Sequence, residues 1–115
     1  MKKFFAPIGE LSELDTLCTA IREKKGAVHV IGAAETQKAH LMAACLSKTG
    51  KRAVVVSWSE SAARQMAEEL SFFSDRVTFL PQGDFIERFA ESSGYALSRT
   101  RAAALYRILE GDTAV

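Results

Sequence analysis

Four short apolar runs, separated by segments of helical periodicity, constrain the fold of this chain more than any other feature. The runs cover residues 27–31, 52–58 and 76–80, and a fourth begins near Thr113; helices are expected over residues 12–25, 38–49, 60–73 and 99–109. Nearly continuous apolar runs are typical of parallel strands that are covered on both faces. The order α-β-α-β-α-β-α-β, with a helix in each crossover, therefore predicts a three-layer α/β/α domain with a mostly parallel sheet.

Each expected helix carries an apolar stripe that predicts its buried face. Residues 81–98, between the third run and the last helix, form the least regular segment, in which a short helix inside a long connection is expected. The predicted inward positions are Leu14, Leu17, Cys18 and Ile21, then Leu41, Met42, Cys45 and Leu46, then Ala62, Met66, Leu70 and Phe73, and finally Ala102, Leu105, Tyr106 and Leu109.

The segment from Val28 to His40 passes from the first run through a small-residue turn into a helix. A phosphate-binding P-loop occupies this position in nucleotide-binding proteins, with the pattern Gly-x-x-x-x-Gly-Lys-[Ser/Thr]. Gly32 and Lys38 hold the first glycine and the lysine, whereas Gln37 and Ala39 replace the second glycine and the hydroxyl residue. The pattern predicts a degenerate P-loop in a RecA-like half-domain, with Gly32 and Lys38 as vestigial, inactive cofactor-binding residues.

The departures from the pattern disfavour nucleotide chemistry. A left-handed backbone at Gln37 would cost roughly 1–2 kcal/mol, and Ala39 has no hydroxyl that could reach Mg²⁺. The Glu35 carboxylate inside the loop would repel a phosphate about 4 Å away by roughly 4 kcal/mol at a surface-like dielectric. We therefore expect no catalytic residue, no cofactor and no metal site in this chain.

Length and composition predict a single domain over residues 1–115. The chain stops at Val115 just as the fourth run begins, so we expect a fragment of a longer protein; the alternative is a complete protein closed by a short edge strand. The formal net charge of +1 gives no overall electrostatic case for binding nucleic acid, and no apolar run is long enough to span a membrane. Cys18 and Cys45 have no Cys-x-x-Cys pattern or neighbouring histidine, so they are interpreted as reduced packing residues of a cytoplasmic protein.

Three further features have alternative interpretations. His29 is expected to be a half-buried strand residue and not a ligand, and Trp58 is expected to pack under a loop, although it follows a strand end where α/β sheets place ligands. Five basic residues could form a strip for DNA, but an arginine-bearing helix face is usually only solvated. They are Lys51, Arg52, Arg99, Arg101 and Arg107.

Several of these segments together resemble a known family. They are the strand, loop and helix over residues 28–46, the run at 53–56, the helix at 62–70, the motif Phe79-Leu80-Pro81-x-x-Asp84-Phe85, and Arg101-x-x-x-Leu105-Tyr106-x-x-Leu109. This succession resembles the N-terminal module of the bacterial transcription-repair coupling factor, which is similar to the first domain of the excinuclease B subunit. The resemblance covers residues 27–115 and implies that the chain is an N-terminal fragment of a longer multidomain protein.

The resemblance implies a non-catalytic scaffold within a DNA-repair translocase that couples stalled transcription to nucleotide-excision repair. Later domains of such a protein would bind ATP, Mg²⁺ and DNA and act as the helicase-like motor. The partners implied are the excinuclease A subunit and RNA polymerase, reached mainly through regions outside this chain. The alternatives are a functional P-loop nucleotide-binding domain and an unrelated Rossmann-like domain that binds a small molecule. The sequence lacks the Gly-x-Gly-x-x-Gly turn, which argues against a dinucleotide-binding form of the second alternative.

Overall fold

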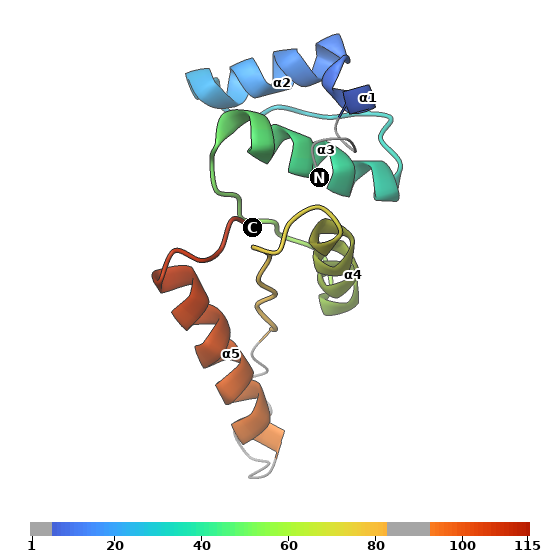
Figure 1. Cartoon of the computed structure of the whole chain (residues 1–115). Helices are drawn as coiled ribbons and strands as arrows, with labels where there is room; N and C mark the ends of the chain where they lie inside the picture. The colour runs from blue at the N-terminus through green and yellow to red at the C-terminus, as the bar shows by residue number, and fades with distance from the viewer. Residues whose placement is uncertain (1–5, 83–92) are drawn as a thin grey trace.

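The computed structural model describes residues 6–82 and 93–115, and every regular element in these two ranges is a helix. The helices are α1 (Ala6–Gly9), α2 (Ser12–Glu23), α3 (Glu35–Thr49), α4 (Glu60–Ser71) and α5 (Ser93–Leu109) (Figure 1). The predicted three-layer α/β/α sheet is therefore wrong for the described residues. Expectations for residues 83–92, which include Asp84 and Phe85 of the resemblance, lie outside them.

The apolar runs lack the backbone pairing that would make them strands. The Ala53 N–H donates to the Ala114 carbonyl at 2.9 Å, the Thr78 N–H to the Val115 carbonyl at 2.9 Å, and the Ala114 N–H to the Arg76 carbonyl at 2.7 Å. These few bonds tie three segments together but do not continue into ladders. β-Propensity alone makes no strand, because a neighbour must pair with the backbone groups along the whole run.

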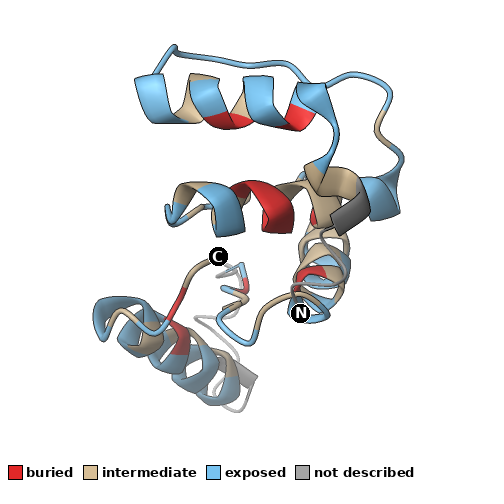
Figure 2. Ribbon diagram, turned by 45° about the horizontal axis from the view of Figure 1, so that its top comes forward, coloured by how far each residue is buried: buried red, intermediate tan, exposed pale blue. Residues whose placement is uncertain are grey.

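Helix α3 lies between α2 and α4 and shares a small core with each. Leu14 and Cys18 of α2 pack against Ala44 and Cys45 of α3. A second cluster joins Ala39 and Ala43 of α3 to Leu70 of α4. In Figure 2 buried residues lie on the facing sides of these helices, while most of the remaining chain is exposed.

The predicted stripes on α2 and α4 are confirmed, and the stripe on α3 is shifted. Leu17 and Ile21 border the first cluster, and Met66 and Phe73 border the second. On α3 the fully buried positions are mostly alanines, whereas Leu41, Met42 and Leu46 are half-buried. Small residues let α3 approach a neighbour on each side, which a single apolar stripe does not predict.

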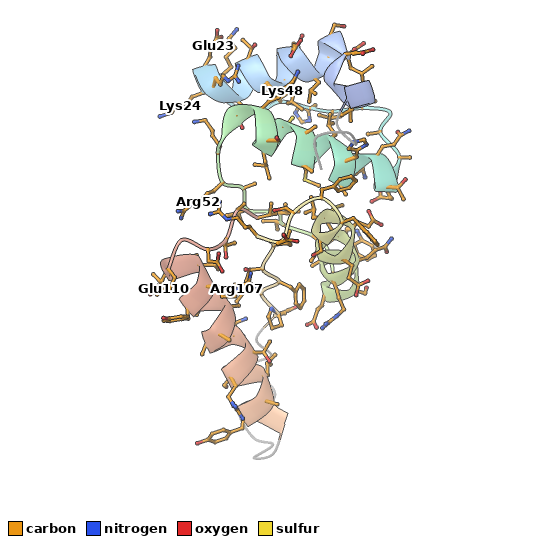
Figure 3. All side chains as sticks on the ribbon, in the orientation of Figure 1. Glu23, Lys24, Lys48, Arg52, Arg107 and Glu110 are labelled. Carbon is orange, nitrogen blue, oxygen red and sulfur yellow. The ribbon has the colours of Figure 1, made fainter. Side chains whose placement is uncertain are left out.

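Polar contacts join α2 to the end of α3, where Figure 3 labels Lys48. The Lys48 ammonium pairs with the Asp15 carboxylate at 2.8 Å and also donates to the Gly9 carbonyl at 3.3 Å. The Arg22 guanidinium donates to the Lys48 carbonyl at 2.6 Å. Because both members of the ion pair are partly exposed, its contribution to stability is expected to be about 1 kcal/mol or less.

The ends of α3 and α4 follow ordinary capping chemistry. Gly50 ends α3 in the left-handed region, with φ of 66°, and its N–H donates to the Leu46 carbonyl. Ser59 caps α4, because its hydroxyl oxygen accepts a hydrogen bond from the Ala62 N–H at 3.2 Å. Helix α3 begins at Glu35, three residues before the predicted start at Lys38.

Helix α5 turns a different face inward from the one predicted. Leu105, Tyr106 and Leu109 are exposed and Ala104 is buried. Arg101 donates to the Pro81 carbonyl, and Arg107 donates to the Val77 carbonyl at 3.5 Å. The arginine side therefore faces residues 76–82, whose carbonyl groups accept these donors in place of a strand.

The positions of the helices make the molecule elongated, with α5 projecting away from the α2–α3–α4 layer (Figure 1). The radius of gyration is 16.3 Å and the principal extents are 53 × 28 × 26 Å. A compact domain of this length has a radius of gyration of about 13 Å. The chain therefore leaves more apolar surface uncovered than a closed domain would.

Candidate functional site

The predicted phosphate loop is an exposed turn that leads into α3. Gly32 has φ of +86°, a left-handed conformation for which glycine is suited, and the space around it is open. Lys38 lies six residues later, at the end of the first turn of α3. No hydrogen bond or ion pair among the described residues joins these two predicted site residues to each other.

Side chains of the loop itself occupy the groups that a phosphate would need. The Lys38 ammonium pairs with the Glu35 carboxylate on the same helix face. The Gln37 side-chain carbonyl accepts a hydrogen bond from the Ala34 N–H at 3.0 Å, at the helix N-terminus. A carboxylate in the first turn also interacts favourably with the helix dipole, so the lysine and one of the N-terminal N–H groups are already engaged.

Ala39, at the position of the missing hydroxyl, is fully buried between α3 and α4. Its methyl group is part of the second core cluster and does not face the loop. The residue that would hold Mg²⁺ in a working P-loop is thus a packing residue.

Two aromatic expectations are wrong, whereas the expectation that both cysteines are free packing residues is confirmed. His29 is exposed, and Trp58 is exposed instead of packed under a loop. Cys18 and Cys45 are both buried in the α2–α3 cluster. Burial, together with the adjacent Cys18 thiol, raises the pKa of Cys45 from 9.0 to about 12.

The basic strip is not assembled as a continuous surface. Arg101 and Arg107 are turned toward backbone carbonyls of residues 77–81. The Arg52 guanidinium lies beside Gly111, with Nη2 3.1 Å from the position that a Cβ would take there. Arg52 and Arg107 can be located in Figure 3, in the segment after α3 and on α5.

An apolar groove, which the sequence interpretation missed, lies where residues 52–60, 77–82 and 113–115 approach α4. Its volume is about 480 Å³, and Met66, Ala67 and Leu70 of α4 form part of its lining. The apolar run at 52–58 predicts a strand buried on both faces, whereas its alternate side chains are exposed. Its even-numbered positions hold only large or charged residues, and this pattern was the available signal.

Comparison of the chain with protein-family models, with curated proteins and with solved structures finds no significant match. Within residues 6–82 and 93–115, no group of three or more histidine, cysteine or acidic side chains is arranged to hold a metal ion. No helix in the same ranges is both long enough and apolar enough to cross a membrane.

Proposed function

We propose that this chain is a non-catalytic interaction module of a cytoplasmic DNA-repair translocase that couples stalled transcription to nucleotide-excision repair. The excinuclease A subunit and RNA polymerase would be partners of the whole protein. ATP, Mg²⁺ and DNA would bind to its other domains. The sequence resemblance supports the assignment to a repair translocase, and the residues of the loop support the lack of nucleotide chemistry.

The non-catalytic part of the proposal rests on the interactions that Lys38 and the Ala34 N–H already make with side chains of the same loop. An incoming phosphate would have to break the Lys38–Glu35 pair and would then meet the freed carboxylate. It would also compete with the Gln37 side chain for the Ala34 N–H at the helix N-terminus. Repulsion by one carboxylate at about 4 Å offsets the attraction of one lysine at the same distance, so the loop has little net affinity for a phosphate.

The two alternative functions receive less support. A working P-loop nucleotide-binding domain requires the second glycine and the hydroxyl, which are absent from the sequence. A Rossmann-like small-molecule domain binds its ligand at the end of a parallel sheet, and the described residues contain no such sheet.

The nucleotide part is tested by thermal unfolding with millimolar Mg-ATP. A nucleotide at 100 times its Kd would stabilise the fold by about 2.7 kcal/mol and raise Tm by several degrees. We expect no shift in the native chain, in Lys38→Ala or in the matched surface control Lys51→Ala. A shift that Lys38→Ala abolishes and Lys51→Ala retains would refute the proposal.

A second variant tests whether the loop is closed by the residues named. Glu35→Ala combined with Gln37→Gly removes both internal partners, and we expect its Tm to respond more to Mg-ATP than that of the native chain. The interaction part is tested by hydrogen exchange with the excinuclease A subunit and with RNA polymerase. The measurement is made on the whole protein: protection of residues of this chain by either partner supports the proposal, and exchange of this chain that neither partner changes contradicts it.

A further inference from the structure

The groove beside α4 lies between two extended segments that a third segment joins at one end. Residues 52–57 and 76–82 run along its two sides, and residues 113–115 lie between them at that end. Through its carbonyl and its N–H, Ala114 makes a main-chain hydrogen bond to each side, at 2.9 and 2.7 Å. Because one extended segment reaches both sides, the space between them has the width of a single strand.

The main chain of residues 52–57 points alternately into the groove and away from it. Side-chain exposure alternates along this segment, as it does in an extended chain. In such a chain the N–H and C=O groups of successive residues point to opposite edges. Because the Ala53 N–H donates to the Ala114 carbonyl, the main-chain groups of Val55 and Ser57 also point into the groove.

The opposite side of the groove shows the same alternation. The Thr78 N–H donates to the Val115 carbonyl at 2.9 Å, so the main-chain groups of Leu80, two residues later, point into the groove as well. The carbonyls of Val77 and Pro81 accept hydrogen bonds from arginine side chains of α5. These odd-numbered carbonyls therefore face outward, as the alternation requires.

Two main-chain edges thus face each other across the groove. In the part of the chain that the structure describes, no hydrogen bond reaches the main-chain groups of Val55, Ser57 or Leu80. Edges of this kind are templates for pairing with another strand. An extended peptide placed in line with residues 113–115 would make hydrogen bonds to both edges.

The floor of the groove determines which side chains such a peptide should carry. Val55, Val77 and Val115 all pack against the second core cluster, and Met66 and Ala67 of α4 line the groove with them. Alternate side chains of a strand in the groove would lie on this apolar surface. The volume of about 480 Å³ falls within the range of about 300–1,000 Å³ that is typical of ligand pockets.

We propose that this groove binds an extended peptide of a partner protein, which lies between residues 52–57 and 76–82 as the central strand and carries apolar side chains at alternate positions. Main-chain hydrogen bonds to two edges supply the affinity, and the alternate side chains supply the specificity. The site goes beyond the proposed function, because it involves neither the loop nor the repair partners.

Amide hydrogen exchange of the full chain tests the site. The probe is a capped peptide in which three valines alternate with two threonines between terminal lysines. At about ten times its Kd, we expect exchange at Val55, Ser57 and Leu80 to slow by roughly tenfold. The amides of Val54 and Val56 point to the opposite edge and should be unchanged. No protection at millimolar peptide, or equal protection of both sets, would overturn the proposal.

N-methylated peptides test the insertion between two edges. Successive amides of an inserted strand donate to opposite sides, so methylation of either alternate set should weaken binding by roughly tenfold or more. Weakening by one set alone would mean addition to a single edge and would contradict the central position. Protection of Val55 that rises with the concentration of the chain itself, without peptide, would assign the groove to a second copy and would also overturn the proposal.

A variant of the groove floor completes the test. Ala67→Leu places a larger side chain in the groove and should weaken peptide binding by roughly tenfold. The control is Ala62→Leu, since Ala62 is half-buried in the same helix but does not line the groove. Circular dichroism at 222 nm checks that both variants are folded. Equal peptide affinities of the two folded variants would contradict the assignment of this site.

Discussion

Replacement of Leu14 by alanine measures how much of the stability comes from the α2–α3 cluster. Leu14 is fully buried there. The change deletes three carbon atoms, whose transfer free energy is about 2.4 kcal/mol at about 0.8 kcal/mol per CH₂ group. The cavity left behind raises typical costs to about 3–5 kcal/mol. We expect about 3 kcal/mol, because a core of few residues near the surface can partly collapse.

The matched control is Leu105→Ala in α5. The sequence stripe predicts Leu105 as a core residue, but its side chain is 47% exposed. The same deletion should therefore lower the free energy of unfolding by only about 1 kcal/mol, because only about half of the side chain is buried and little cavity forms. The comparison separates the observed position of α5 from the one that its periodicity predicts.

Urea unfolding followed by circular dichroism at 222 nm provides the measurement. With a slope of about 1.5 kcal/mol/M, Leu14→Ala should lower the midpoint by about 2 M and Leu105→Ala by less than about 1 M. Equal slopes for the three proteins would show that both effects are changes in stability. A cost for Leu105→Ala equal to or greater than that for Leu14→Ala would refute the packing described for α5.

Two smaller changes test the helix cap and the buried thiol. Ser59→Ala removes the hydroxyl that accepts the hydrogen bond from the Ala62 N–H, so it should lower the free energy of unfolding by about 1 kcal/mol in the same urea assay. The control Ser47→Ala, on the exposed side of α3, should leave that free energy almost unchanged. Equal losses in the two variants would contradict the capping role. The pKa of Cys45 is raised from 9.0 to about 12 in the folded chain. The unfolded chain therefore loses this proton first, and the stabilisation from the neutral buried thiol should be complete below pH 9 and be lost as the pH rises toward 12. Alkylation by iodoacetamide, followed by mass spectrometry, should accelerate near pH 9 in urea and only near pH 12 in the folded chain; coincident profiles would show that the thiol is not buried.

Helix positions could be predicted from the sequence wherever an apolar stripe met a neighbouring helix. The stripes on α2 and α4 are right because each helix buries one face against α3. The sequence predicts that α3 starts at Lys38, three residues too late, because the P-loop pattern assigns Glu35 to a loop. In the structure Glu35 opens the helix and pairs with Lys38.

The strands could not be predicted reliably because an apolar run contains no information about its partner. Ala53-Val54-Val55-Val56 has high β-propensity, but a strand requires hydrogen bonds from residues distant in sequence. Among the described residues, only the Ala53 N–H in this segment makes such a bond, which it donates to the Ala114 carbonyl. The stripe on α5 failed for a related reason, since Arg101 and Arg107 find carbonyl acceptors on residues 77–81, and this turns the leucines outward.

Gly32, Gln37, Lys38 and Ala39 predict an impaired phosphate loop, and its lack of affinity for nucleotide stays a prediction. The geometry of the loop could not be predicted. The Gln37 hydrogen bond to Ala34 could not be foreseen, because it depends on where the helix begins.

Helix α3 belongs to both core clusters, and this has a consequence for how the chain opens. Detachment of α2 breaks only the cluster around Leu14, and detachment of α4 breaks only the cluster around Leu70. Loss of α3 breaks both at once. The chain can therefore unfold partially in two ways at low free-energy cost, by detachment of α2 or of α4. The amides of α3 are expected to exchange with solvent only when both clusters have opened.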